Sequence, residues 1–244
     1  MSTQAEPSRA ELTHIDSLVE HFTQNVKLLD TLRAQLVTAI AGANFYAHVH
    51  SLRSRLKSPT HLRDKLLRKL QDSRKANRKF AITTANLFYR VNDLVGLRIL
   101  HLHTQQFEPI NRGLHALFSE FKYKCIEGPT ARTWDDETRE YFSRLNVATI
   151  PSASLYTSVH YVVDAGLDSR CTAEIQVRTL AEELWGEVDH SINYPHKTRS
   201  VACREQIKAL ARATSSCSRL VDSIYRSNED FISSSRVSSH GRKR

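Results

Sequence analysis

The sequence predicts an α+β fold, in which a small mixed β-sheet is flanked by helices. Apolar segments typical of strands alternate with helical segments, but without the regular β-α-β order of a doubly wound sheet. The 244 residues, of which 40% are hydrophobic, suffice for one sizeable core and are few for two full domains. The seven glycines form no phosphate-binding loop of the Walker or dinucleotide type.

The expected helices follow from apolar residues spaced three and four apart, and the strands from short alternating or continuous apolar runs. Helices are expected at 11–43, from the Ser58 cap and Pro59 onward, and at 106–121, 179–193 and 201–231. In the fourth of these, Leu180, Leu184, Val188 and Ile192 share one face. Strands are expected at 94–102, 121–126, 158–164 and 172–177, and a loop or short helix at 128–151.

The chain is expected to contain one main domain with short additions at both ends. We assign a disordered start to 1–10, the domain with its N-terminal helix to 11–200, a helical extension to 201–232 and a disordered basic tail to 233–244. The chain has no membrane-length apolar run and no apolar signal region, which predicts a cytoplasmic protein without a membrane partner. Its four cysteines are widely spaced, which is typical of free thiols.

Positive charge is concentrated in one segment. Residues 51–79 contain eleven Lys and Arg residues and two Asp residues, a net charge of +9, which equals the formal charge of the whole chain. Such a local excess suits a polyanion, either a nucleic acid or a nucleoside triphosphate.

Candidate functional side chains alternate with apolar residues on two expected strands. Glu174, Gln176 and Arg178 point to one side of their strand, while the intervening residues point to the core. Tyr156, Ser158 and His160 share a face in the same way, and an exposed Tyr there could stack on a purine. Taken alone, these patterns also fit a solvated edge strand and a packed Tyr.

Asp93 stands directly before the apolar strand that begins at Leu94. An acid in this place is usually a turn residue. If Asp93 met Glu174 across the sheet, the two would form a hard-cation site, because magnesium binds one or two carboxylates together with substrate phosphates.

These residues together resemble the synthetase domain of the RelA/SpoT family over about residues 45–200. The resemblance rests on Asp93-Leu94-Val95-Gly96-Leu97-Arg98, Tyr156-Thr157-Ser158-Val159-His160, and Glu174-Ile175-Gln176-Val177-Arg178-Thr179 followed by Trp185 and His190. Upstream, Arg55-Leu56-Lys57-Ser58 with Lys65 looks like the ATP-binding basic helix of that family. The resemblance implies a nucleotidyltransferase-like fold in a small, stand-alone alarmone synthetase.

The resemblance also implies an activity and roles for single residues. The enzyme would move the β,γ-pyrophosphate of ATP to the 3′-hydroxyl of GDP or GTP, making (p)ppGpp and releasing AMP. Asp93 and Glu174 would hold Mg²⁺, with Glu174 also the candidate general base. The ATP phosphates would contact Arg55, Lys57, Lys65 and Arg98. Tyr156 would stack on guanine, and His160, Gln176 and Arg178 would line the acceptor side.

Glu183 suggests a hypothesis about base selection. It lies on the helix after the Glu174 strand, on the side away from Leu180 and Leu184. A carboxylate there could accept hydrogen bonds from the N1–H and 2-amino groups of guanine, which adenine lacks. A solvated helical Glu is the competing interpretation.

The acceptor loop departs from the family pattern. Where relatives have a Lys and an Asn-Gly before the stacking Tyr, this chain has Ser152, Ser154 and Leu155. The missing Lys leaves the acceptor phosphates without their usual partner. The sequence offers five replacements and does not choose among Lys122, Lys124, Arg132, Arg139 and Arg144.

Two other functions remain open on the sequence alone. A toxin-type relative would pyrophosphorylate the 3′ end of tRNA or an adenosine nucleotide, and the altered loop and the basic tail fit this. A non-catalytic nucleic-acid-binding module would use the basic segment, but it would not need Asp93 and Glu174. The apolar stripes of the helices at 11–43 and 201–231 fit either packing on the sheet or pairing between subunits. The family resemblance implies a homo-oligomer, because small relatives often form one.

Overall fold

The computed structural model describes residues 6–166, 170–193 and 197–241, with side chains through Ser235. Six strands form one mixed sheet in the order β1-β2-β6-β5-β3-β4. The β2–β6 and β3–β4 pairs are parallel, and the others are antiparallel. This confirms the predicted α+β class. The strands are β1 (Ser51–Leu56), β2 (Val95–His101), β3 (Lys124–Thr133), β4 (Ala148–Pro151), β5 (Ser158–Asp164) and β6 (Thr172–Thr179).

Strands β2, β5 and β6 match their predicted segments closely. The loop or short helix predicted for 128–151 is confirmed only in part: the segment contains a short helix, but it also contains strand residues at both ends. Strand β3 continues through Thr133, and helix α6 (Asp136–Arg144) and strand β4 follow it. The pairing of β3 with β5 shifts register twice, between Cys125 and Thr130. These irregularities break the alternation of inward and outward residues, which removes the pattern that sequence analysis depends on.

The predicted N-terminal helix is two helices, α1 (Arg9–Gln24) and α2 (Val26–Ala41). Asn25 separates them because its side-chain amide donates to the His21 carbonyl at 2.8 Å, closing the end of α1. Ser8 begins α1 with a capping box to Glu11, so residues 9 and 10 are helical although we expected a disordered start through residue 10. Residues 1–5 lie outside the described part.

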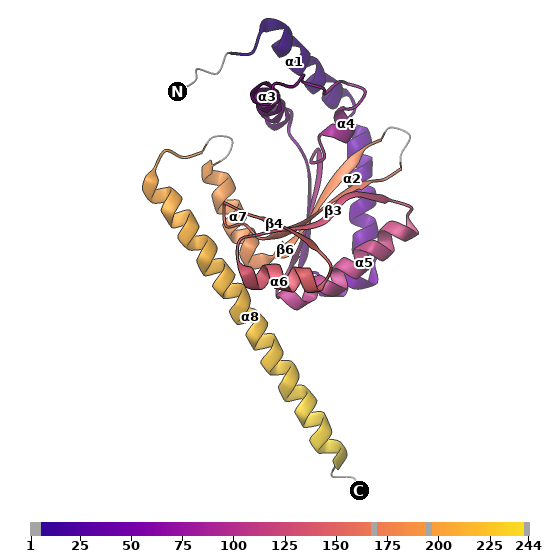
Figure 1. Ribbon diagram of the computed structural model, residues 1–244. Helices are drawn as coiled ribbons and strands as arrows, with labels where there is room; N and C mark the ends of the chain where they lie inside the picture. The colour runs from indigo at the N-terminus through magenta and orange to yellow at the C-terminus, as the bar shows by residue number, and fades with distance from the viewer. Residues whose placement is uncertain (1–5, 167–169, 194–196, 242–244) are drawn as a thin grey trace.

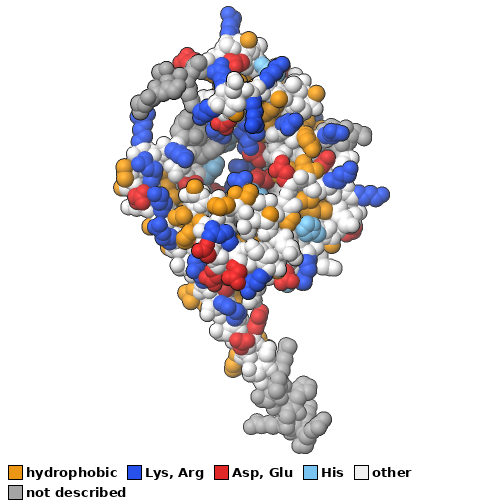
Figure 2. Space-filling view, in the orientation of Figure 1, with side chains coloured by type: hydrophobic (Ala, Val, Ile, Leu, Met, Phe, Trp, Pro, Cys, Tyr) orange, Lys and Arg blue, Asp and Glu red, His pale blue; other side chains and the backbone are white. Residues whose placement is uncertain are grey.

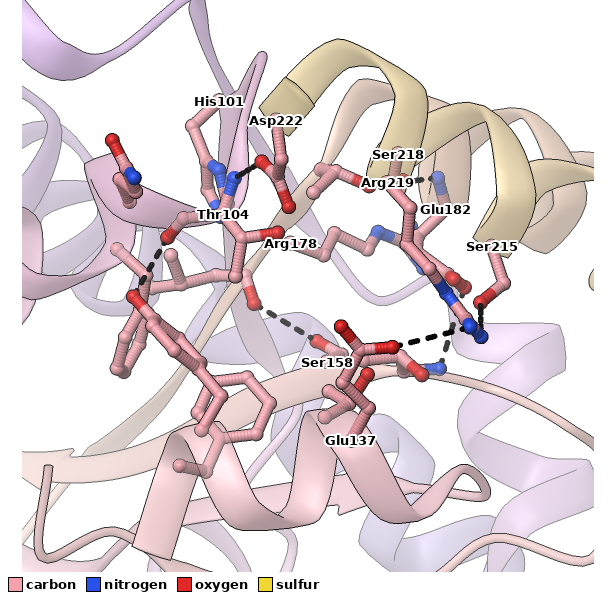
Figure 3. A pocket seen from close by; sticks show the side chains of 18 of the residues that line it. His101, Thr104, Glu137, Ser158, Arg178, Glu182, Ser215, Ser218, Arg219 and Asp222 are labelled. Atoms are coloured by element: carbon pink, nitrogen blue, oxygen red, sulfur yellow. Dashed lines mark hydrogen bonds and ion pairs between the residues drawn. The ribbon is translucent and has the colours of Figure 1, made fainter. Parts of the chain in front are cut away.

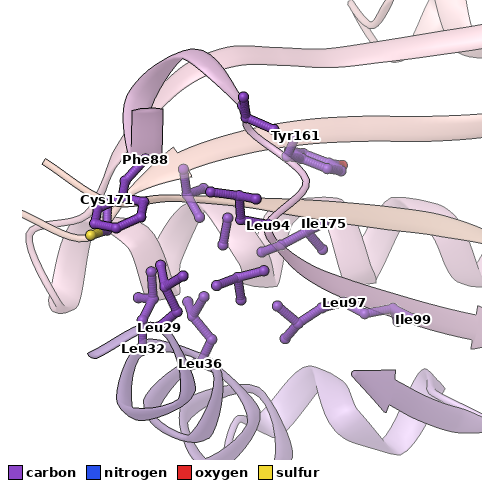
Figure 4. Packing of buried hydrophobic residues seen from close by; sticks show 14 of the residues in the cluster. Leu29, Leu32, Leu36, Phe88, Leu94, Leu97, Ile99, Tyr161, Cys171 and Ile175 are labelled. Atoms are coloured by element: carbon purple, nitrogen blue, oxygen red, sulfur yellow. The ribbon is translucent and has the colours of Figure 1, made fainter. Parts of the chain in front are cut away.

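One face of the sheet is packed by α2 and by α5 (Phe107–Glu120) (Figure 1). Figure 4 shows how α2 meets this face: Leu29, Leu32 and Leu36 approach Leu97, Ile99 and Ile175 of the central strands. Because side chains alternate along a strand, the neighbours of these strand residues must point to the opposite face. That second face carries the candidate functional residues.

Helix α7 (Leu180–Asn193) lies on the second face and contacts β6 and β2. The predicted apolar face of α7 exists, but it points away from the sheet: Leu180, Leu184 and Ile192 are exposed. The buried residues of this helix include Glu182 and Glu183. Charge interactions with the sheet, described below, therefore decide which side of α7 faces inward.

Helix α8 (Val201–Gly241) packs along α7 and then extends beyond the rest of the molecule (Figure 1). It passes the predicted end at Phe231 and includes residues 233–241, which we expected to be disordered. The hydroxyls of Ser234 and Ser235 donate to carbonyls one turn earlier, at 2.8 and 2.9 Å, so these serines bond within the helix. Residues 242–244 of the expected tail lie outside the described part. No helix among the described residues is long and apolar enough to cross a bilayer.

Candidate active site

Polar side chains form ordered rows across the second face of the sheet. Arg53 of β1 pairs with Arg98 of β2, which pairs with Gln176 of β6, which pairs with His160 of β5. In the next row, Arg55, Gly96 and Glu174 are partners in the same register. Residues remote in sequence therefore become neighbours through strand pairing alone.

Asp93 lies where β2 begins and is held by two lysines. Its carboxylate oxygens are 2.9 Å from Lys57 Nζ and 2.7 Å from Lys65 Nζ. Lys57 follows β1 and its amide donates to the Leu94 carbonyl at 2.9 Å, which joins the two strand ends. Burial by itself would raise the pKa of Asp93, but the two lysines outweigh it and hold this pKa below its usual value.

The basic segment is not one helix, which corrects the expectation for the predicted ATP-binding residues. Arg55 belongs to strand β1, Lys57 to the turn after it and Lys65 to helix α3 (Pro59–Lys75). As predicted, Ser58 caps this helix, accepting from the His61 amide at 3.2 Å, and Pro59 occupies its first turn. The sequence does contain a signal for this strand. Arg53 and Arg55 are two residues apart, and such alternation is typical of a strand and not of a helix.

Glu174 is fixed by its neighbours on the sheet. His160 Nδ1 lies 3.0 Å from one of its carboxylate oxygens, and the Gln176 side chain donates to the other at 3.0 Å. Burial and the charge of Asp93 raise the pKa of Glu174, whereas His160 and Gln176 lower it, and the net pKa lies below the usual value. Glu174 is therefore an ionised, oriented carboxylate at neutral pH.

Asp93 and Glu174 converge on one small cavity of about 170 Å³, whose other walls include Arg55, Gly96 and Arg98. A second cavity of about 300 Å³ shares Asp93 and Arg55 with the first. It is also lined by Lys57, Lys65, Arg68, His61 and His190. Figure 2 shows a hollow on this side of the molecule with Lys, Arg, Asp and Glu side chains around it.

The donor set fits a magnesium ion. Within the described ranges, no group of three or more His, Cys, Asp or Glu side chains could hold a metal. Magnesium does not need such a group, because it binds one or two carboxylates and completes its shell with water and phosphate oxygens. Asp93 and Glu174, facing one cavity beside several cations, provide that arrangement.

The predicted acceptor residues are close together, but Tyr156 is not free. Its ring lies 5.6 Å from the ring of Trp185, and the Arg178 guanidinium lies 5.5 Å from its centroid. Its hydroxyl accepts from Arg178 at 3.1 Å and donates to Gln176 at 3.4 Å. The contacts are those of a packed Tyr, the competing interpretation of this residue.

One residue of the acceptor loop, Leu155, has a backbone conformation that usually requires glycine. Leu155, which stands where relatives have Gly, has a φ of 62°, in the left-handed region that disfavours residues with a side chain. The Ser152 hydroxyl accepts from the Tyr156 amide at 3.1 Å and closes this turn. None of the described residues lining the two Asp93 cavities is one of the five candidate replacement cations, Lys122, Lys124, Arg132, Arg139 and Arg144.

Glu183 is buried, with its side chain 4% exposed, and its carboxylate pairs with arginines instead of facing these cavities. Its partners are Arg53 at 3.3 Å, Arg98 at 3.1 Å and Arg178. The solvated-Glu interpretation is therefore wrong. Because Glu183 is buried, a guanine could reach this carboxylate only if the surrounding side chains moved.

A larger cavity of about 460 Å³ lies between α6, α8 and the ends of β5 and β6 (Figure 3). Arg178 and Ser158 line it from the sheet, and Arg219 and Asp222 from α8. Glu182, at the start of α7, is 4% exposed and accepts from the Thr157 amide at 3.3 Å. The sequence does not single out Glu182, because nothing in its local pattern distinguishes it from a solvated helical Glu.

The fold and site describe an α+β protein with two carboxylates facing a cationic cavity. Residues 54–199 match the family model described as a region found in RelA / SpoT proteins. This match covers more than half of the chain, and the chain belongs to the RelA/SpoT family. A search of curated protein sequences gives no match.

Solved structures of small alarmone synthetases share the fold. The small alarmone synthetase 1 from Bacillus subtilis aligns with a TM-score of 0.59 and 17% identity, over 88% of this chain and 99% of that one. A GTP pyrophosphokinase family protein from Streptococcus pneumoniae aligns with a TM-score of 0.57 and 20% identity, over 88% and 94%. The Bacillus enzyme bound to its product pppGpp aligns with a TM-score of 0.53 and 18% identity, over 86% and 95%.

Burial of Glu182 makes stability depend on pH. Desolvation raises the pKa of Glu182 to about 7 from an ordinary value of 4.5. The native state then binds more protons than the unfolded state between these values, so Glu182 increasingly destabilises the fold as pH rises from 4.5 to 7. Glu182→Gln should be more stable than the parent at pH 8, by up to about 3 kcal/mol, and equal to it near pH 4.

Chemical denaturation at the two pH values checks this prediction. Glu140→Gln, which replaces an exposed acid of α6, is the matched control. If the variant and the parent differ in free energy of unfolding by the same amount at pH 4 and at pH 8, burial does not raise the pKa of Glu182 and the prediction is wrong.

Gly96 leaves the floor of the smaller cavity open between Arg55 and Glu174. A Cβ atom there would lie 3.7 Å from the Arg55 side chain, an ordinary contact that the fold accepts. Gly96→Ala should therefore fold normally. Under the function proposed below, it should weaken binding of magnesium–ATP about tenfold, roughly 1.4 kcal/mol, because the methyl group occupies cavity space. Calorimetric titration measures the affinity for magnesium–ATP, with Gly42→Ala as the control variant. Equal affinities for Gly96→Ala and the parent would contradict the prediction.

Proposed function

We propose that this protein transfers the β,γ-pyrophosphate of ATP to the 3′-hydroxyl of a guanosine nucleotide, GDP or GTP, and releases AMP. The observation that carries the proposal is the convergence of Asp93 and Glu174 on one cavity opposite Arg55, Lys57 and Lys65. Membership in the RelA/SpoT family and the fold of small alarmone synthetases support it.

The cationic half of the site suits the phosphates of ATP. Lys57 and Lys65 come from different elements and meet at Asp93, so their ammonium groups are already in place before a ligand arrives. Arg55 lines both cavities and Arg98 lines the smaller one. Phosphoryl transfer needs positioning and charge stabilisation more than covalent help from the protein, and these residues supply both.

The carboxylate half would hold Mg²⁺ and accept a proton. With Asp93 and Glu174 as ligands, a bound magnesium ion would neutralise charge on the transferred group. Glu174 would take the proton of the 3′-hydroxyl as the new bond from that oxygen to the β-phosphorus forms and the bond from the α,β-bridging oxygen to the β-phosphorus breaks. His160 and Gln176 orient Glu174 for this step through their hydrogen bonds.

The acceptor would lie toward β5, beside His160 and Gln176. Arg178 would belong to this side, since it fixes the Tyr156 hydroxyl. Stacking of guanine on Tyr156 requires a ring face that neither Trp185 nor Arg178 covers. Guanosine is therefore proposed mainly from the family, and the altered loop at Ser152, Ser154 and Leu155 favours a second candidate acceptor, an adenosine nucleotide or the 3′ end of tRNA.

A labelling assay tests the reaction and its acceptor together. Purified protein with magnesium and γ-labelled ATP is offered GDP, GTP, ATP or deacylated tRNA, and we expect label in the guanosine products. Asp93→Asn and Glu174→Gln should each lower kcat at least about a hundredfold, because each removes a charge from the transfer centre. The matched control Glu205→Gln changes an exposed acid on α8 and should be fully active.

The same assay separates the alternatives. Label in a 3′-pyrophosphorylated adenosine nucleotide or in tRNA, and in no guanosine product, would replace guanosine by the second candidate. If no acceptor gains label and binding to nucleic acid instead falls steeply with salt, the protein is a nucleic-acid-binding module and the proposed reaction is wrong.

We also propose that the protein forms a homo-oligomer through α8. Leu220, Ile224 and Phe231 on this helix are 63%, 58% and 71% exposed, and the helix extends beyond the body (Figure 1). Contiguous exposed apolar residues of this kind typically mark an interface.

Light scattering at micromolar concentration tests the oligomer. Ile224→Asp should shift the molar mass toward that of one chain, because it buries a charge in the proposed interface. Ser223→Asp, a neighbouring exposed position, is the control and should leave the mass unchanged. A monomeric parent protein would contradict the proposal.

A further inference from the structure

Three guanidinium groups converge on one buried carboxylate next to the proposed site. Arg53, Arg98 and Arg178 belong to β1, β2 and β6, which are adjacent in the sheet, and all three pair with Glu183 of α7. Arg98 also pairs with Glu187, one turn further along the helix, whose side chain is half exposed. Glu183 is thus the partner that all three arginines share, whereas Glu187 is a more exposed partner of Arg98.

Helix α7 is shaped to admit these arginines. A Cβ atom at Gly186 would lie 2.7 Å from Arg178 Nη1, so the absence of a side chain there is what allows the guanidinium to pass. The Arg178 side chain is only 3% exposed, and a charge so buried needs a close partner. Glu183 and Gly186, three residues apart, lie on the same side of the helix and face the sheet together.

Two of the anchored arginines also face the proposed transfer centre. Arg53 and Arg98 line the cavity of about 170 Å³ that contains Asp93 and Glu174. A guanidinium has five N–H donors, so each of these arginines can contact Glu183 and still donate to a phosphate oxygen. Without an anchor, such long side chains would lose conformational freedom when they bind.

We propose that Glu183 is a positioning residue that fixes Arg53 and Arg98 toward the phosphates of the bound nucleotide, and that it does not read the guanine base. This rests on the proposed function, since the phosphates are those of ATP. Arg53 thereby joins the phosphate-binding set. Glu183 acts through the arginines, and its carboxylate touches neither substrate.

Steady-state kinetics of Glu183→Gln distinguishes the two roles. Loss of the anchor should lower kcat about 10- to 100-fold, because the arginines remain charged but are no longer held in place. The ratio of guanosine to adenosine acceptor use should stay unchanged. A changed base preference, with kcat kept for the preferred acceptor, would overturn the proposal.

A double-mutant cycle tests whether Glu183 acts through Arg98. In the parent, Arg98→Met should weaken binding of magnesium with an α,β-methylene ATP analogue about tenfold; in Glu183→Gln, the same change should cost less than about threefold. Equal losses in both backgrounds would show that the residues act independently and would refute the proposal. Because this readout is binding, it decides about Glu183 even if the parent transfers no pyrophosphate, a result that would refute only the proposed function.

Two further variants guard against a simple loss of folding. Glu183→Asp keeps the charge but shortens the side chain by one methylene group; thermal unfolding should remain cooperative while kcat falls about tenfold. Glu205→Gln, the matched control, removes an exposed acid of α8 that pairs with Lys208 and should change kcat by less than about threefold. Full activity of Glu183→Asp would mean that only the charge matters, which contradicts a positioning role.

Discussion

The pairing of β2 with its neighbours β1 and β6 is the constraint on which the site depends. It places Gly96 beside both Arg55 and Glu174, and it brings the start of β2, with Asp93, to the turn that contains Lys57. Carboxylates that are 81 positions apart in the sequence therefore share one cavity. A register shift of one residue would turn Glu174 into the apolar core and destroy the site.

The site is held by charge pairing more than by apolar packing. On one face of the sheet, α2 packs leucines against the strands, and this face needs no polar partner. On the other, α7 turns its acids inward and leaves Leu180 and Leu184 exposed, because Arg53, Arg98 and Arg178 require a counter-charge. Such pairs contribute little net stability, but breaking one is costly, which makes them suited to fixing geometry.

Much of this arrangement could be predicted where the pattern is regular. The alternation of Glu174, Gln176 and Arg178 predicted both the strand and its polar face, and the Ser58–Pro59 pair predicted the start of α3. The irregular strand β3 could not be predicted, because its register shifts erase the alternation. The side of α7 that faces the sheet also could not be predicted. Its leucines form a regular apolar stripe, which suggests that they face inward, whereas the arginines that pair with Glu183 belong to strands distant in the sequence.

The location of the metal tests the account most directly. Crystals grown with Mn²⁺ and an α,β-methylene ATP analogue would reveal the ion by its anomalous scattering. We expect a peak within coordination distance of both the Asp93 and Glu174 carboxylates, with analogue phosphates on its other side toward Lys57 and Lys65. An ion bound elsewhere, or phosphates bound away from these lysines, would contradict it.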